Sequence, residues 1–143
     1  MKIIFVCSGN TCRSPMAQAI MMDALKKHNI ENVEIDSFGL YCNEGDPISQ
    51  GAKQALANMD IEFDSSSKPL TKDAINEADY IICMTSSHKA ALKDVVDANK
   101  LFTMNELAQK GEIIDPYSQS LEVYIKTAEQ IKESINVILS KIV

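Results

Sequence analysis

Residues 2–16, KIIFVCSGNTCRSPM, contain a strand, a loop and the start of a helix. The apolar run from Ile3 to Val6 is typical of a strand that is buried on both faces. After the loop, Ser14 suits a helix N-cap, and Pro15 suits the first helical position, where its missing N–H costs nothing. We therefore expect this loop to connect a strand directly to a helix.

Strands and helices alternate along the rest of the chain. We expect strands at residues 2–6, 33–38, 79–84 and 101–103, and helices at 15–28, 49–59, 72–78, 87–98, 105–109 and from 119 onward. Such alternation predicts a parallel sheet with helices on both faces and with ligands bound beyond the carboxyl ends of the strands. A chain of 143 residues is expected to form one domain, 1–143. The predicted fold class is α/β, a single-domain Rossmann-like three-layer sandwich around a four-stranded parallel sheet.

The last predicted helix carries apolar residues at steps of three and four. They are Leu121, Ile125, Ala128, Ile131, Ile135, Ile138 and Ile142. This spacing puts them along one face of a helix, so we expect the stripe to pack against the core.

The loop from Cys7 to Ser14 has the pattern C-x5-R-S, which suits the binding of a tetrahedral anion. A tight strand-to-helix loop turns successive backbone N–H groups inward at the positive end of a helix dipole. Arg13 adds a planar fork of donors, and Gly9 and Asn10 tolerate a tightly turned backbone. Cys7 would lie at the bottom of this cradle, where the N–H dipoles favour the nucleophilic thiolate. We therefore predict that Cys7 attacks a bound phosphate group.

The loop and its cysteine have other possible interpretations. A free cysteine at the end of a strand is most often a small buried residue, so Cys7 has that alternative. Both histidines, His28 and His88, are expected at the surface, which disfavours a catalytic Cys-His pair. The loop also lacks the Gly-Lys pair of the nucleotide-binding G-x4-G-K-[ST] pattern.

Asp115-Pro116-Tyr117 supplies a candidate general acid. Proline restricts the preceding residue to extended backbone, which would hold Asp115 in a defined presentation. A carboxylic acid opposite Cys7 could protonate the leaving group and then activate water as a base. The alternative is an ordinary turn, because Asp-Pro pairs are common in turns.

These motifs together resemble the low-molecular-weight protein tyrosine phosphatase family. The resemblance rests on the loop from Cys7 to Ser14, on Asp115-Pro116-Tyr117 and on the strand that ends near Met84. It implies that Cys7 forms a phosphocysteine, that Arg13 stabilises the phosphoryl transition state and that Asp115 is the acid. By the same resemblance, the phosphate-binding residues are Ser8, Gly9, Asn10, Thr11, Cys12, Arg13 and Ser14.

Position 11 separates two substrate classes within this family. Members that act on phosphotyrosine usually have isoleucine there, whereas this chain has Thr11. A hydroxyl weakens apolar contact with a phenyl ring and offers a polar partner to a guanidinium. Thr11 and the pair Met84-Thr85 resemble the bacterial protein arginine phosphatases, so we expect phosphoarginine, with phosphotyrosine as the alternative. Tyr41 and Tyr117 are candidates for the rim of the substrate pocket or for ordinary half-buried packing.

Two departures from the family pattern concern the support of Asn10. Many relatives carry a histidine that buttresses this asparagine, near the stretch where this chain has Ser65, Ser66 and Ser67. Ser37 is followed by Phe38 where most members have alanine, which makes the neighbourhood of the loop bulkier. We expect Ser37 to be able to hydrogen-bond toward the loop.

Composition limits the partners that the chain can have. The formal net charge is −6, which argues against a nucleic-acid binder, because such proteins need a basic face. No apolar run reaches the roughly 20 residues of a membrane span, and the start lacks a signal-peptide core. We therefore expect a cytoplasmic monomer without a membrane or nucleic-acid partner, which acts on phosphorylated proteins and releases inorganic phosphate.

The four cysteines, at positions 7, 12, 42 and 83, do not indicate a disulfide framework. The chain has no C-x2-C pair and no H-E-x-x-H motif, so neither a metal nor another cofactor is expected. Cys12 should lie near Cys7 in the curled loop. A reversible Cys7–Cys12 disulfide that protects the nucleophile is therefore a hypothesis.

Two function classes compete with a phosphatase. A thiol-coupled arsenate reductase shares the fold and the loop, but it needs two further cysteines on a mobile segment, where only Cys83 falls. A non-catalytic phosphate-binding protein could keep the loop without turnover. The presence of both a nucleophile and an acid argues against that class.

Overall fold

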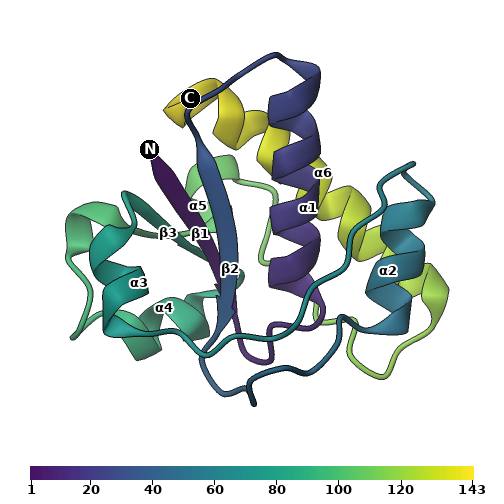
Figure 1. Ribbon diagram of the computed structural model, residues 1–143, viewed down its shortest axis with the longest axis horizontal. Helices are drawn as coiled ribbons and strands as arrows, with labels where there is room; N and C mark the ends of the chain where they lie inside the picture. Colours follow the sequence, from purple (N-terminus) through teal and green to yellow (C-terminus); the bar gives the residue numbers. More distant parts are fainter.

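The computed structural model describes all residues, 1–143, and has one parallel sheet in the order β2-β1-β3-β4 (Figure 1). The strands are β1 (Lys2–Cys7), β2 (Glu34–Gly39), β3 (Tyr80–Cys83) and β4 (Leu101–Thr103). The helices are α1 (Arg13–Lys27), α2 (Gln50–Ala57), α3 (Lys72–Glu77), α4 (Ser86–Leu92), α5 (Met104–Ala108) and α6 (Leu121–Ile142), with a short 3-10 helix, η1 (Ala98–Lys100). The predicted four-stranded parallel sheet is confirmed.

Helices cover both faces of the sheet, as predicted. Side chains alternate along β1, so that Ile3 and Phe5 pack with α1, α2, α5 and α6. Ile4 and Val6 point to the opposite face and pack with residues of α3 and α4. Figure 1 shows α1, α2 and α6 on one side of the sheet and α3 and α4 on the other. The three-layer sandwich is therefore confirmed.

The predicted helix from Ser87 to Ala98 is wrong at its carboxyl end. The helix α4 ends at Leu92, and a turn leads from there to η1. The Oδ1 atom of Asp97 accepts a hydrogen bond from the backbone N–H of Asn99 at 2.9 Å, and this bond caps η1. This local bond competes with a longer helix, while Leu92 and Val96 both still reach the core.

The apolar stripe of α6 is confirmed in its middle and is wrong at its start. Ala128, Ile131 and Ile135 are fully buried. Leu121, the first residue of the helix, is 44% exposed, and Tyr124 of the same turn is buried instead. The buried face at this end is therefore displaced from the predicted stripe.

The strand order places the end of β1 in the middle of the sheet. Cys7 pairs with Gly39 of β2, and Val6 pairs with Cys83 of β3. The chain crosses from β1 to β2 on one side and to β3 on the other, so the carboxyl end of β1 is the topological switch point, where α/β sheets bind ligands. The loop that follows Cys7 lies at this point.

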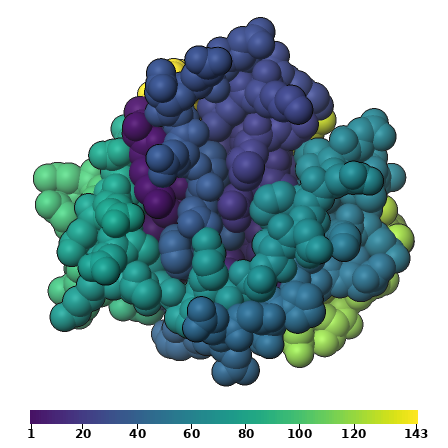
Figure 2. Space-filling view, in the orientation of Figure 1, coloured from purple at the N-terminus to yellow at the C-terminus, as the bar shows by residue number.

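The segment between α2 and α3 extends across this end of the sheet, as the ribbon and space-filling views show (Figures 1 and 2). Its backbone is bonded to the end of β2, because Gly39 N–H donates to the carbonyl of Lys68 and Leu70 N–H donates to that of Gly39, each at 2.9 Å. Lys68 of this segment also donates its backbone N–H to Asn10 Oδ1 at 2.9 Å, so the segment lies against the loop.

Candidate active site

The backbone N–H groups of the loop are unpaired within the protein. No N–H from Ser8 to Ser14 donates a hydrogen bond to another protein group, and the first bonded one after Pro15 is that of Met16, which reaches the carbonyl of Cys12 at 3.2 Å. Asn10 has φ 54°, the left-handed conformation expected there. A run of successive free N–H groups ahead of a helix is the arrangement of an anion-binding nest.

Cys7 lies at the base of this loop with its sulfur beside a hydroxyl. The side chain is buried, and its Sγ is 2.9 Å from Ser14 Oγ. The expectation that Ser14 caps the helix is wrong, because Cys12 occupies the N-cap position and no side chain caps α1. The Ser14 hydroxyl contacts the sulfur instead and also accepts a hydrogen bond from Asn10 Nδ2 at 2.9 Å.

Asn10 is fully supported without the histidine that many relatives carry. Its Nδ2 donates to Ser14 Oγ and, at 3.0 Å, to Ser37 Oγ. Its Oδ1 accepts a hydrogen bond from the backbone N–H of Lys68 at 2.9 Å. The expectation for Ser37 is therefore confirmed, and the segment after α2 supplies a backbone group where a histidine was missing.

Arg13 connects the loop with the segment that carries Asp115. Its side chain is buried, and Nη1 donates to the carbonyl of Ile113 at 3.2 Å. Nη2 lies 3.7 Å from Asp115 Oδ2 in an ion pair. The Asp115 side chain is 60% exposed, and its Oδ1 accepts the Tyr117 N–H at 3.1 Å. The two predicted residues are therefore brought together although they are about a hundred positions apart.

His88 contradicts the expectation of a surface histidine, whereas His28 is exposed as expected. The His88 ring is buried, and its Nε2 lies 2.9 Å from Ser8 Oγ, inside the loop. Burial, followed by the nearby positive charge of Arg13, lowers the pKa of His88 to about 4. At neutral pH this imidazole is therefore uncharged. The Ser8–His88 contact spans eighty positions, and no local pattern in the sequence marks it.

The remaining loop side chains are partly or fully buried, whereas the two tyrosines are exposed. Thr11 is half-buried, and its carbonyl accepts the N–H of Ser49 at 2.9 Å. Cys12 is buried, with its Sγ 3.4 Å from Ser49 Oγ. Tyr41 and Tyr117 are 75% and 69% exposed, so neither is the half-buried packing residue that was the alternative.

All four cysteines are free thiols in the structure. Cys83 is fully buried in β3, and this burial raises its pKa to about 12. Cys42 is partly buried in a loop, and desolvation, followed by the neighbouring Cys7, raises its pKa. A high pKa disfavours the thiolate, so these two cysteines are poor nucleophiles. The hypothesis of a Cys7–Cys12 disulfide stays a prediction.

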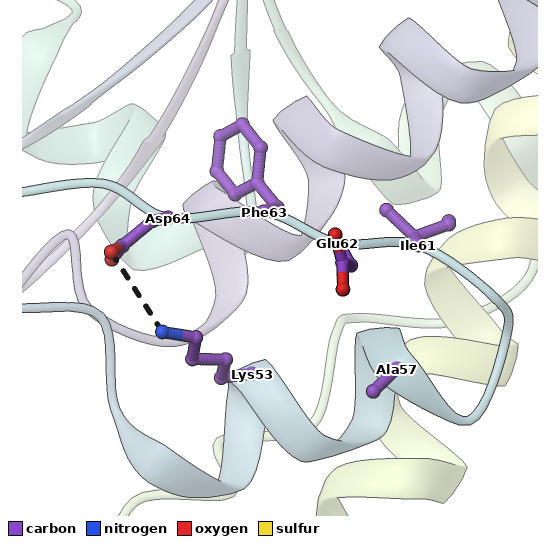
Figure 3. Close-up of a pocket in the computed structure, with 6 residues that line it drawn as sticks. All are labelled: Lys53, Ala57, Ile61, Glu62, Phe63 and Asp64. Atoms are coloured by element: carbon purple, nitrogen blue, oxygen red, sulfur yellow. Dashed lines mark ion pairs between the residues drawn. The ribbon is translucent and has the colours of Figure 1, made fainter.

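A separate hollow lies between α2 and the chain that follows it (Figure 3). It is lined by Lys53, Ala57, Ile61, Glu62, Phe63 and Asp64. Lys53 faces Asp64 across it at 3.7 Å, in an exposed ion pair that contributes little to stability. None of its residues belongs to the loop or to the Asp115 segment, so this hollow does not enter the chemistry.

None of the helices combines the length and the apolar character that crossing a membrane requires.

Comparisons with known proteins agree with the geometry. The family model of the low molecular weight phosphotyrosine protein phosphatases matches residues 2–143. A protein-arginine-phosphatase of Bacillus subtilis (strain 168) is 33% identical over 137 residues, covering 93% of this chain and 91% of the relative. The tyrosine phosphatase PtpB of Staphylococcus epidermidis is 36% identical over 143 residues, covering 99% of both chains.

Solved structures of both kinds of phosphatase have the same fold. The YwlE arginine phosphatase, solved as a variant with a phosphorylated active-site serine, superposes with a TM-score of 0.93 at 30% identity, covering 99% of this chain and 95% of that one. A low molecular weight protein tyrosine phosphatase from T. tengcongensis has a TM-score of 0.93 at 36% identity and 99% coverage of both chains. The chain described here belongs to the low molecular weight phosphotyrosine protein phosphatase family.

Proposed function

We propose that this chain is a protein arginine phosphatase that works through a phosphocysteine intermediate at Cys7. The observation that carries the proposal is the placement of the Cys7 sulfur below a run of unpaired N–H groups, with the guanidinium of Arg13 beside Asp115. A cradle of donors around a nucleophile is the arrangement that phosphoryl transfer needs, because its transition state spreads negative charge over the phosphate oxygens.

In the first step, the Cys7 thiolate attacks phosphorus from the base of the cradle. The S–P bond forms as the bond from phosphorus to the leaving nitrogen or oxygen breaks, and protonated Asp115 gives its proton to the leaving atom. The loop N–H groups and the fork of Arg13 hold the phosphate oxygens throughout. The dephosphorylated side chain then leaves, and phosphocysteine remains.

In the second step, the Asp115 carboxylate takes a proton from water. The water oxygen attacks phosphorus, the S–P bond breaks, and inorganic phosphate leaves together with a regenerated Cys7 thiolate. Asp115 is suited to both steps because 60% of its side chain is exposed, so that water reaches it. The YwlE arginine phosphatase with a phosphorylated active-site serine supports a covalent intermediate in a related protein.

Phosphoarginine is the proposed substrate because of Thr11. This residue is half-buried in the loop, and the family resemblance puts position 11 at the wall of the substrate pocket, where its hydroxyl would add a polar group. A phenyl ring gains from an apolar wall, whereas a guanidinium gains from a hydrogen-bond acceptor. Sequence identity does not decide between phosphoarginine and phosphotyrosine, because an arginine phosphatase matches at 33% and a tyrosine phosphatase at 36%.

Phosphotyrosine is the second candidate substrate. Tyr41 and Tyr117 are both largely exposed, and an aromatic rim could stack on a phenyl ring as well as on a guanidinium plane. An arsenate reductase is disfavoured, because Cys83 is fully buried inside β3 and therefore does not lie on a mobile segment. The monomeric state and the cytoplasmic location stay predictions.

The substrate proposal is tested by measuring kcat/KM for phosphoarginine-bearing and phosphotyrosine-bearing protein with the wild-type enzyme and with Thr11→Ile. We expect the wild type to prefer phosphoarginine and Thr11→Ile to shift the ratio toward phosphotyrosine by about tenfold, since one pocket contact changes. Thr11→Val is the matched comparison. It removes the hydroxyl at nearly constant volume, so it separates the effect of the lost hydroxyl from the effect of the larger isoleucine side chain. A wild-type preference for phosphotyrosine, or a ratio that neither variant moves, would overturn the substrate assignment.

A further inference from the structure

The loop depends on outside contacts to keep its shape. None of its N–H groups is used for internal bonding, so the shape is set by bonds to its carbonyls and side chains. Tyr41 N–H donates to the carbonyl of Ser8 at 3.0 Å, and Ser49 N–H donates to that of Thr11 at 2.9 Å. Asn10 is fixed by Lys68. The first half of the loop has one further contact, which is made by the Ser8 side chain.

That contact is to His88 of α4. His88 Nε2 lies 2.9 Å from Ser8 Oγ, and Nδ1 lies 3.0 Å from Thr85 Oγ1. Thr85 caps α4, because its hydroxyl oxygen accepts the backbone N–H of His88 at 3.5 Å. The ring is only 5% exposed, so both nitrogens are committed to these two hydroxyls.

The start of α4 is also bonded to the segment that carries the proposed acid. Ser86 N–H donates to Glu112 Oε1 at 2.5 Å, and Ile113 N–H donates to the carbonyl of Met84 at 3.3 Å. The carbonyl of Ile113 in turn accepts from Arg13. His88 therefore stands on an element that contacts the loop on one side and the Asp115 segment on the other.

Burial, followed by the positive charge of Arg13, lowers the pKa of His88 and keeps the ring neutral. Arg13 lies on the loop side, while Glu112 and Asp115 face the ring from the other segment, and burial together with Arg13 outweighs the two carboxylates. A neutral imidazole has one donor and one acceptor. Ser8 Oγ and Thr85 Oγ1 are hydroxyl oxygens that can each donate or accept, so the two ring nitrogens have hydrogen-bond partners in either tautomer.

We propose that His88 is a positioning residue of the phosphate loop, which acts through the hydrogen bond between its Nε2 and the Ser8 hydroxyl. This inference rests on the proposed function of the loop. It assigns no contact between His88 and the substrate. The bond holds the loop residue next to Cys7, so that the N–H groups at the start of the loop stay aimed at one bound anion.

Two substitutions of His88 test the contacts of its two ring nitrogens separately. His88→Gln places an amide N–H near the position of Nε2, whereas His88→Asn reaches only the position of Nδ1. The readouts are the dissociation constant of inorganic phosphate by calorimetry and kcat and KM for p-nitrophenyl phosphate. His28→Asn is the matched control, since His28 is exposed and distant in sequence from the loop.

We expect His88→Asn to weaken phosphate binding and to lower kcat/KM by about tenfold, which corresponds to about one hydrogen bond. His88→Gln should stay within about twofold of the wild type, and Ser8→Ala should match His88→Asn without adding to it in the double variant. Equal losses in both His88 variants, or full phosphate affinity in His88→Asn, would overturn the assignment.

Misfolding and failure of the proposed function give different results. If the His88 variants do not fold, Ser8→Ala removes the same bond from the partner that is only partly buried, and its full phosphate affinity would reject the inference. If the wild type shows no turnover that depends on Cys7, the proposed function fails. Calorimetry with phosphate still decides whether His88 positions the loop in that case.

Discussion

Ser14 shows how the local preference of a residue yields to its place in the fold. Its position before a proline predicts an N-cap, but its hydroxyl contacts Cys7 Sγ and accepts from Asn10, each at 2.9 Å. Because Asn10 supplies a donor, the single proton of the hydroxyl is free to point at the sulfur. Ser14 can thus donate a hydrogen bond to the Cys7 sulfur, while its oxygen, which helix capping would have used as an acceptor, accepts from Asn10 instead.

The sequence singled out Cys7, Arg13 and Asp115 of the candidate site and missed two other groups that contact the loop. Cys7 and Arg13 lie on one loop, and the Asp-Pro pattern singled out Asp115, which the structure brings to 3.7 Å from Arg13. His88 and the carbonyl of Ile113 were not predicted. Their contacts with the loop depend on how β3 and the chain after α5 are placed against β1, which no local pattern encodes.

At the residue scale, Asp115→Asn tests the role of Asp115 as the general acid. An amide cannot give up a proton, so we expect kcat to fall by about 10²- to 10⁴-fold for substrates with poor leaving groups, such as alkyl phosphates. For substrates whose leaving groups need no proton, the rate of phosphocysteine formation should fall far less. Pre-steady-state burst rates across a series of phenyl phosphates measure this dependence. Equal slowing across the series would count against an acid role.

Periodicity predicted the elements well and their ends poorly. The long helix α6 is present with its middle buried, yet Leu121 is exposed and Tyr124 is buried in its place. The helix α4 stops at Leu92, five residues before Asp97, whose side chain caps η1. Element ends are set by single side-chain bonds and by where the neighbouring layer stops, and a pattern of apolar residues contains neither.

Packing of α6 on the sheet is tested with Ile135→Ala. The side chain is fully buried, so its removal should lower the free energy of unfolding by about 2 to 5 kcal/mol through lost burial and a cavity. Leu121→Ala is the control in the same helix, with an expected change within about 0.5 kcal/mol. Urea unfolding measures both. Comparable losses in the two variants would contradict the observed buried face.

The element α4 carries a pH dependence through His88. Its pKa is about 4 in the folded chain, below the 6.5 of a free histidine, so the unfolded chain binds the extra proton first. Stability should therefore fall as pH drops from about 6.5 toward 4, and the contribution should level off below that. Urea midpoints across this range measure it, with His88→Asn as the comparison. A wild-type slope no steeper than that of the variant would show that His88 does not titrate as described.

At the scale of the whole molecule, the sheet order determines where the candidate site lies. The crossing of the chain to both sides of β1 leaves its carboxyl end open, and the loop, Arg13 and the segment after α5 meet there. The alternation of elements predicted the parallel sheet but left the order of its strands undetermined. That order follows from which hydrophobic faces meet, which is a property of the folded chain.

The proposed mechanism requires the sulfur of Cys7 to carry the phosphoryl group during turnover. Mass spectrometry of the wild-type enzyme, quenched in acid while it turns over a phosphorylated protein, measures this directly. We expect phosphate on the peptide that contains Cys7, and neither this label nor turnover in Cys7→Ala. A labelled residue other than Cys7, or undiminished turnover in Cys7→Ala, would contradict it.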